Sequence, residues 1–356
     1  MFNHSEFLVH TTSLVLSRLG WDESYSVAFD AMALDSTVPA RVVFVASRTV
    51  TVIADTGPHE AVRAGRLRTS PPPGGLTTGD WVAVDDNTVH AVVPRRSALL
   101  RRAAGNAAVA QAVAANVDVV FIAAPLGLAV GARRLERSLA IAWSSGARPV
   151  VLLTKADLSA DLAVDLAAAT AVAAGAHVIA VSAAGLGLED VRACLPEART
   201  GAIVGPSGAG KSTLINNLCG GLRLATASVR DDGRGRHTTT NRELVELPGG
   251  GMLIDTPGMR EMGVWDAQAG IDAVFADVAE LASQCKFGDC SHNGEPGCAV
   301  REAAIGNPAI LDRLASVRKL EREQRFQDLQ VDQRLRAEAR REHRRWARAV
   351  RSQPHR

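Results

Sequence analysis

The chain has 356 residues, 47% of them hydrophobic, which allows two or three domains, each with its own core. Its N-terminus lacks a basic region followed by a long apolar run, and its most apolar stretch is shorter than the roughly 18 residues that span a bilayer. These features disfavour an exported or membrane-spanning protein, and we expect a soluble, cytoplasmic one.

The formal net charge of +2 hides an uneven distribution. Residues 334–356 contain nine arginines and two glutamates, so this tail carries +7 and the remainder of the chain carries −5. The tail has helical propensity, and either a solvated helix or a partner with a phosphate backbone would explain its charge. The five cysteines are an odd number in a chain without an export signal, which favours a metal site or free thiols over disulfides.

In chain order, residues 1–37 are predicted to be an N-terminal extension. Residues 38–107 are predicted to form a small β-barrel of the OB type, because apolar and polar residues alternate in short segments that a Gly/Pro-rich stretch separates. A fragment of a β-sandwich without a binding role would show the same alternation, so it is the alternative.

Residues 108–275 alternate between predicted strands and helices, which is typical of a mostly parallel sheet covered on both faces. Residues 276–356 combine a Cys/His cluster with a charged helical stretch. We therefore expect a multidomain protein, with an N-terminal OB-fold β-barrel, a central α/β P-loop domain, and a mostly helical zinc-binding domain that ends in the basic tail.

A glycine-rich loop, GPSGAGKS, connects a predicted strand to a predicted helix and fits the pattern G-x-x-x-x-G-K-[ST]. Backbone N–H groups of such a loop bind phosphates, while Lys211 would reach the β and γ oxygens and the Ser212 hydroxyl would bind Mg²⁺. A Gly-rich turn without a ligand is the alternative, and both flanks argue against it. The predicted phosphate-binding residues here are Gly205, Pro206, Ser207, Gly208, Ala209, Gly210, Lys211, Ser212 and Thr213.

A second motif, TKAD, follows an apolar run that starts at residue 150 and is typical of guanine recognition. The Asp157 carboxylate would accept hydrogen bonds from N1–H and the exocyclic amine of guanine, a donor pair that adenine lacks. Lys155 would lie over the base and brace the phosphate loop, and Thr154 replaces the usual asparagine. A later strand ends in VSA, which would supply a backbone contact to guanine O6. The predicted guanine-binding residues are Thr154, Lys155, Ala156, Asp157, Ser182 and Ala183.

The sequence LIDTPG predicts a strand that ends in the motif D-x-x-G. Asp255 would lie in the second coordination shell of Mg²⁺, and the Gly258 N–H would contact the γ-phosphate. The polar, Gly/Arg-rich segment before this strand ends in three threonines and is typical of a switch that a shared Mg²⁺ orders, with an ordinary surface loop as the alternative. We predict Thr239 as the magnesium ligand beside Ser212, although Thr238 and Thr240 also fit the pattern.

Met259 stands where many GTPases carry a glutamine that orients water. Hydrolysis is then either slow in the isolated protein or supported by another group. His237, beside the switch threonines, is the predicted catalytic residue because its unperturbed pKa allows a neutral imidazole at physiological pH. A solvent-exposed histidine without a catalytic role is the alternative.

The segment CKFGDCSHNGEPGC supplies three thiols and one imidazole, with tight Gly and Asn turns between them. This set matches a closed tetrahedral zinc site, which is structural because no coordination position stays open. Such a site also folds a segment that is too small for its own core. Free thiols in a loop are the alternative. The predicted ligands are Cys285, Cys290, His292 and Cys298.

The order of the motifs differs from that of an ordinary GTPase, in which the phosphate loop comes first. Here TKAD and VSA precede the phosphate loop, and the threonine switch and D-x-x-G follow it. Cutting a GTPase sheet between D-x-x-G and the base-reading strand, and joining the old ends, gives this order; surface termini make such a permutation tolerable. Residues 108–275 are therefore predicted to be a circularly permuted GTPase domain that leads directly into the zinc module.

With this order, the sequence GRGRHTTT and the Cys/His cluster, the chain resembles the circularly permuted ribosome small-subunit-dependent GTPases, the RsgA (YjeQ/YloQ) family. The resemblance covers nearly the whole chain, although the Arg-rich tail is longer and more basic than the family pattern. It implies an OB-fold, a GTPase domain and a zinc domain, with Mg²⁺ bound beside GTP and one structural Zn²⁺.

The resemblance also implies a function. It implies binding to the 30S ribosomal subunit and its 16S rRNA in late maturation, and hydrolysis of GTP to GDP and phosphate that the subunit stimulates, to drive release or a checkpoint. It further implies that His237 orients water. We also expect a monomer without a membrane partner. The rival functions are a P-loop kinase or ATPase, and a GTP-dependent RNA-binding module with negligible turnover, which Met259 leaves open.

Overall fold

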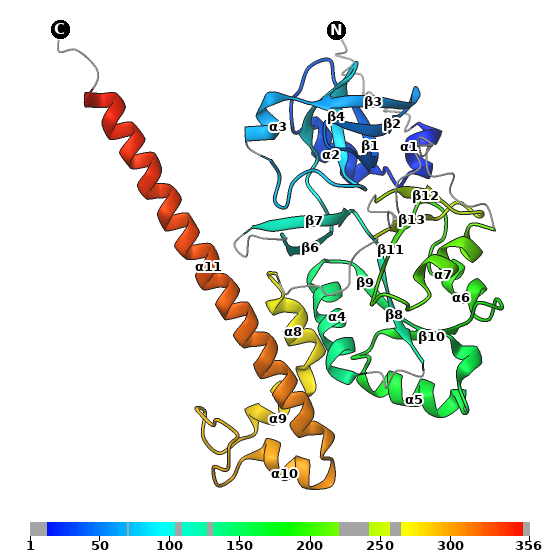
Figure 1. Ribbon diagram of the computed structural model, residues 1–356, viewed down its shortest axis with the longest axis vertical. Coiled ribbons are helices and arrows are strands. Elements are labelled where there is room, and N and C mark those ends of the chain that lie inside the picture. Colours follow the sequence, from blue (N-terminus) through cyan, green and yellow to red (C-terminus); the bar gives the residue numbers. More distant parts are fainter. Residues whose placement is uncertain are drawn as a thin grey trace, which may run out of the picture.

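The computed structural model describes residues 13–69, 71–103, 109–126, 131–220, 242–256 and 265–351. Figure 1 shows a barrel, a sheet flanked by helices, and a group of helices that ends in one long helix. None of the helices in these ranges is both long and apolar enough to cross a membrane.

The barrel closes because β1 pairs with β2 on one side and with β4 on the other. In the described residues its strand order is β1-β2-β3-β5-β4. Alternate residues of β2 are buried, so Val50, Val52 and Ala54 pack in the interior. This closed barrel confirms the predicted OB type and excludes the sandwich fragment. The strands are β1 (Val38–Val45), β2 (Thr49–Ala54), β3 (Gly57–Arg63), β4 (Trp81–Asp85) and β5 (Thr88–Val92), with the short helix α3 (Gly65–Thr69) after β3.

Two short helices precede the barrel, α1 (Leu14–Arg18) and α2 (Glu23–Asp30). Trp21, between them, packs edge-on against Trp81 of β4, with 4.8 Å between ring centroids. Tyr25 of α2 joins the same aromatic group and is 4% exposed. The described part of the N-terminal segment is therefore folded against the barrel.

The central sheet has the order β10-β9-β8-β11-β13-β12 in the described ranges, and its neighbouring strands are parallel except β12 with β13. β8 is buried along its whole length. Its Val120 and Ile122 belong to the core beneath α4 and α5, whereas Val119 and Phe121 belong to the core beneath α6 and α7. The predicted sheet with helices on both faces is thus confirmed.

The connectivity of the sheet shows the circular permutation. Strands β8, β9 and β10 lie on one side of β11 and precede it in the chain, while β13 and β12 lie on its other side and follow it. The strands are β8 (Val119–Pro125), β9 (Arg148–Thr154), β10 (His177–Val181), β11 (Thr200–Val204), β12 (Leu244–Glu246) and β13 (Met252–Asp255). The helices are α4 (Ala132–Ser144), η1 (Ala156–Leu158), α5 (Leu162–Val172), α6 (Leu188–Ala193) and α7 (Lys211–Leu218).

An antiparallel ribbon of β6 (Ala98–Arg102) and β7 (Ala110–Ala115) connects the barrel to the sheet. This ribbon was not predicted from the sequence. The ribbon pairs β6, which follows the barrel, with β7, which leads into β8.

A buried arginine joins the barrel to the sheet. Arg41 of β1 is 2% exposed, and burial lowers its pKa to about 10. Its guanidinium donates hydrogen bonds to the carbonyl oxygens of Leu19 (2.9 Å) and Asn116 (3.1 Å) and to Oγ1 of Thr200 (3.2 Å). Because Thr200 begins β11, this network connects the barrel to the strand that leads to the glycine-rich loop.

The C-terminal helices are α8 (Gln268–Val274), α9 (Ala276–Ser283), α10 (Ala299–Gly306) and α11 (Ala309–Arg351). α8 crosses α4 so closely that a Cβ at Gly270 would lie 1.8 Å from the Ala140 carbonyl oxygen, and the Gly270 N–H donates to Ser144 Oγ (2.8 Å). The Gln324 side chain of α11 accepts from the Ala267 N–H (3.0 Å) at the start of α8. In Figure 1 the C-terminal half of α11 extends away from the other helices.

Candidate functional site

The predicted nucleotide motifs meet at one edge of the sheet. Strands β9, β10, β11 and β13 are parallel, so their carboxyl ends lie at the same edge, where ligands bind in open α/β sheets. In register, Thr154 pairs with Val181, and Ile203 pairs with Asp255. The four motifs therefore lie at the ends of strands at the same edge of the sheet although they are far apart in the sequence. These motifs are TKAD, VSA, the glycine-rich loop and D-x-x-G.

The glycine-rich loop connects β11 to α7 and needs glycine for steric reasons. Gly205 has φ of +146°, and a Cβ there would lie 2.6 Å from the Ala123 carbonyl oxygen of β8. Gly210 has φ of +82° and is the N-cap of α7. The loop therefore follows the backbone of β8 closely and directs the first N–H groups of α7 toward a bound anion.

Lys211 begins α7 and is half-buried. Its Nζ donates to the carbonyl oxygens of Gly205 (2.8 Å) and Pro206 (2.7 Å), so the ammonium group lies over the loop. Burial lowers the pKa of Lys211, while the nearby Asp255 carboxylate raises it. The positive charge is thus held where the phosphates of a nucleotide would lie.

The strand that ends in TKAD contacts the glycine-rich loop directly. Thr154, at the end of β9, is 4% exposed, and its hydroxyl donates to the Ala209 carbonyl oxygen at 2.6 Å. Among the described residues, the side-chain hydrogen bond between this strand and the loop thus comes from Thr154, the residue that replaces the usual asparagine. Lys155 has φ of +60°, and η1 then presents Asp157 in an exposed position. The arrangement leaves the Asp157 carboxylate accessible to a base.

The second segment predicted to contact the base, Ser182 and Ala183, follows β10. Ser182 is 7% exposed, and its N–H donates to the Leu186 carbonyl oxygen (3.2 Å) within a tight loop. The Ala183 carbonyl oxygen accepts a hydrogen bond from Asn217 Nδ2 of α7 (3.1 Å). Sequence reasoning missed Asn217, because nothing in its local pattern indicates a partner in a distant loop.

The end of β13 completes the described part of the site. Burial raises the pKa of Asp255, and the Lys211 charge lowers it. The buried Thr256 hydroxyl, which was not predicted, donates to the Ile203 carbonyl oxygen and fixes the exit of the strand. Ser212 lies exposed in the first turn of α7. The predicted roles of His237, Thr238, Thr239, Thr240, Gly258 and Met259 fall outside the described residues.

The Cys/His cluster forms a compact set of groups that could hold a metal ion. The Sγ atoms of Cys285, Cys290 and Cys298 and a ring nitrogen of His292 all lie within 4.8 Å of one another. His292 Nδ1 is 3.5 Å from Cys285 Sγ and 3.4 Å from Cys298 Sγ, and these two sulfurs are 4.0 Å apart. Tetrahedral zinc with bonds of about 2.3 Å to sulfur and about 2.0 Å to nitrogen requires similar separations. The residues therefore fit Zn²⁺.

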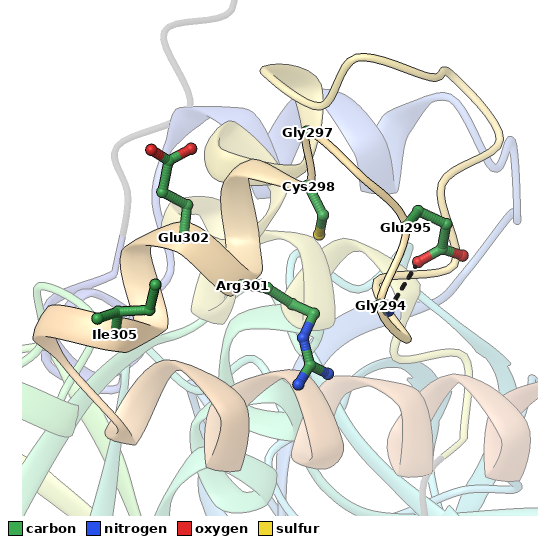
Figure 2. A pocket seen from close by; sticks show the side chains of 7 residues that line it. All are labelled: Gly294, Glu295, Gly297, Cys298, Arg301, Glu302 and Ile305. Carbon is green, nitrogen blue, oxygen red and sulfur yellow. Dashed lines mark hydrogen bonds between the residues drawn. The ribbon is translucent and has the colours of Figure 1, made fainter.

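A carboxylate organises the loop that carries these ligands. Glu295 accepts hydrogen bonds from the N–H groups of Ser291 (3.0 Å), Asn293 (2.7 Å) and Gly294 (3.1 Å). The Ser291 hydroxyl also donates to it, and these contacts lower the pKa of Glu295 to about 2. Figure 2 shows Glu295 and Cys298 at a pocket of about 390 Å³ between this loop and α10. The pocket lies beside the metal ligands and away from the phosphate-binding loop.

The fold and the site together define a circularly permuted P-loop GTPase with a barrel and a metal-binding module. Residues 92–265 match the family model described as RsgA GTPase. The chain belongs to the RsgA family of GTPases and is a GTP hydrolase. This assignment excludes the kinase, the ATPase and the module without turnover.

Relatives support the family assignment over the whole chain. A protein of Streptomyces coelicolor is 44% identical over 94% of this chain and 94% of its own length. A protein of Opitutus terrae is 40% identical over 96% of this chain and 97% of its own length. Both are named small ribosomal subunit biogenesis GTPase RsgA.

Solved structures support the fold. YjeQ from Thermotoga maritima matches with a TM-score of 0.57 at 24% identity, over 80% of this chain and 97% of that one. YloQ, described as a circularly permuted GTPase, matches with a TM-score of 0.57 at 20% identity, over 82% of this chain and 97% of that one. At this identity the likeness concerns the architecture alone.

Proposed function

We propose that this protein binds the 30S ribosomal subunit through its 16S rRNA in late maturation, and that it hydrolyses GTP to GDP and phosphate there. Hydrolysis would drive its release or serve as a checkpoint. The names of the relatives, which refer to biogenesis of the small ribosomal subunit, support this partner. The observation that carries the nucleotide part is the Thr154–Ala209 hydrogen bond, which brings the base-reading strand onto the phosphate-binding loop.

Each group at the sheet edge has a proposed role. Residues 205–213 bind the phosphates, with Lys211 neutralising the β and γ oxygens, and Asp157 accepts hydrogen bonds from guanine. Mg²⁺ neutralises developing charge on the transferred phosphoryl group when it is bound. Ser212 would hold it directly and Asp255 through water; the support is that Ser212 lies in the first turn of α7, which follows β11, and that Asp255 ends β13, the strand paired with β11. Thr239, Gly258 and His237 complete the proposal as magnesium ligand, γ-phosphate contact and water-orienting residue.

We propose one structural Zn²⁺ at Cys285, Cys290, His292 and Cys298. Three thiolates and one imidazole would fill a tetrahedral site and leave no position for a substrate. Metal analysis should find one zinc per chain. A Cys290→Ser variant should lose that zinc and melt at a lower temperature, because the loop has few apolar contacts of its own. Full zinc content in this variant would contradict the ligand assignment.

We further propose a cytoplasmic monomer without a membrane partner, in which residues 38–107, 108–275 and 276–356 act as barrel, GTPase and zinc-binding domains. β6 and β7 pair across the first of these boundaries, so the barrel and the GTPase domain would move together. The barrel and the Arg-rich tail would offer two surfaces for the phosphate backbone of rRNA.

Sedimentation with isolated ribosomal subunits tests the partner. The protein should sediment with 30S subunits in the presence of a non-hydrolysable GTP analogue, and it should dissociate when GDP replaces the analogue. Isolated 50S subunits are the matched control. Equal binding to both subunits, or binding that ignores the nucleotide, would contradict the proposal.

A further inference from the structure

We propose that Asn217 is a positioning residue for guanine recognition, because its side-chain amide holds the loop after β10 in place to donate a hydrogen bond to guanine O6. The inference rests on the proposed guanine site and adds to it a residue on α7, the helix that follows the phosphate-binding loop. Helix α7 would then position the phosphates through Lys211 and Ser212, and the guanine base through Asn217.

The contact is direct. Asn217 Nδ2 donates to the Ala183 carbonyl oxygen at 3.1 Å. The Ala183 N–H meets no hydrogen-bond acceptor within the described part of the chain, so it is available to an acceptor on a ligand. Fixing the Ala183 carbonyl fixes the peptide unit directly after that N–H, and this limits the directions in which the N–H can point.

The rest of the loop is closed on itself. The Ser182 N–H donates to Leu186 (3.2 Å) and the Gly185 N–H donates to Ser182 (3.2 Å). Gly187 has φ of +73°, and a Cβ there would lie 2.1 Å from the Ala180 carbonyl oxygen, so the loop folds tightly onto β10. Among the hydrogen bonds of the described residues, the one from Asn217 joins this loop to α7.

Helix α7 is itself held in place and carries residues at both ends of the proposed nucleotide site. Its first turn carries Lys211 and Ser212, and Arg192 of α6 donates to the Asn217 carbonyl oxygen at 3.1 Å. The other base-reading segment is tied to the same region, because Thr154 donates to Ala209. Each base-facing segment thus has one side-chain hydrogen bond to the unit formed by the glycine-rich loop and α7. Loss of the Asn217 amide should therefore weaken the O6 contact and spare the Asp157 contact.

Nucleotide analogues separate the two contacts. Inosine diphosphate lacks the exocyclic amine that Asp157 reads, and 6-thioguanosine diphosphate replaces O6 with sulfur, a weak acceptor. Dissociation constants of both analogues and of GDP are measured for the wild type and for Asn217→Ala. GDP should bind about 3- to 10-fold more weakly to the variant, the range for one hydrogen bond. The ratio of the dissociation constant of 6-thioguanosine diphosphate to that of GDP, the sulfur penalty, should be smaller in the variant than in the wild type. The corresponding ratio for inosine diphosphate should be the same in both proteins.

Controls distinguish positioning from a structural effect. Asn216→Ala alters the exposed neighbour on the same helix and should bind all three diphosphates like the wild type. Asn217→Asp keeps the size of the side chain, removes the N–H donor and should repeat the effect of alanine. At saturating GTP, kcat of Asn217→Ala should stay within about twofold of the wild type while KM rises, because chemistry at the phosphates is untouched.

The outcomes are distinct. Unchanged GDP affinity and an unchanged sulfur penalty in Asn217→Ala would overturn the inference. An equal loss for all three diphosphates would also overturn it, since it would show a general effect on α7. If the wild type bound inosine diphosphate as tightly as GDP, the Asp157 assignment would fail, and the sulfur penalty would still decide the role of Asn217.

Discussion

At the scale of single residues, Asp22 connects α2 to the segment after the barrel. Its carboxylate caps α2 by accepting from the N–H groups of Ser24 (3.0 Å) and Tyr25 (3.2 Å). Arg96 donates to the same carboxylate at 2.7 Å and lies over the Tyr25 ring. The hydrogen bond from Arg96 is the main cause that lowers the pKa of Asp22 from 3.8 to about 2.

This shift predicts a pH dependence of stability. Because the folded pKa of Asp22 lies below the unfolded value, the pairing stabilises the fold above about pH 4, and this contribution is lost as the pH falls toward 2. Asp22→Asn keeps the helix cap and removes the charge. In urea unfolding, the wild type should be more stable than the variant at pH 6, and the difference should vanish near pH 2. A difference that persists at pH 2 would contradict the charge pairing.

At the scale of elements, a buried ion pair joins α4 to α11. Glu136 of α4 is 1% exposed, and burial raises its pKa. It accepts a hydrogen bond from Arg313 of α11 at 3.0 Å, and Arg313 also donates to Asp277 of α9 at 2.7 Å. Further pairs join the same two helices, Arg133 with Asp312 and Arg137 with Glu323. Ion pairs thus add to the apolar core that α4 and α11 share.

Arg313→Ala should destabilise the protein by about 3 kcal/mol, because it leaves Glu136 buried without a counter-charge. The double variant Arg313→Ala, Glu136→Gln should recover part of that loss, because a neutral amide tolerates burial better than a carboxylate. Urea unfolding measures the free energy of unfolding of the single variants and of the double variant. Arg134→Ala, an exposed site on α4, is the control and should change stability by less than about 0.5 kcal/mol. A double variant as unstable as the sum of its single changes would contradict the account.

Local sequence predicted the elements whose signals are local, and missed those that depend on distant partners. The glycine-rich loop between β11 and α7 and the Cys/His cluster can each be recognised from spacings within a few residues. β3 contains a proline and little apolar alternation, so its pairing with β2 stabilises it as a strand. β6 likewise depends on β7. Asn217 and Arg41 act through contacts between segments far apart in the chain, which periodicity cannot show.

At the scale of the whole molecule, the barrel contacts the residues that follow the threonine-rich segment. The Thr78 hydroxyl donates to the Arg242 carbonyl oxygen at 3.0 Å, and Phe44 of β1 forms a β-bridge with Glu243. Among the C-terminal helices, Gln324 of α11 accepts from the Ala267 N–H. The barrel and the C-terminal helices are thus both attached to segments that flank the proposed nucleotide site.

The most direct test is GTP hydrolysis by the purified protein with and without isolated 30S subunits. The account predicts a strong rise in turnover that is specific for 30S over 50S subunits and for GTP over ATP. No rise with 30S subunits, although GTP is bound, or an equal rise with 50S subunits, would contradict a GTPase that the small subunit stimulates.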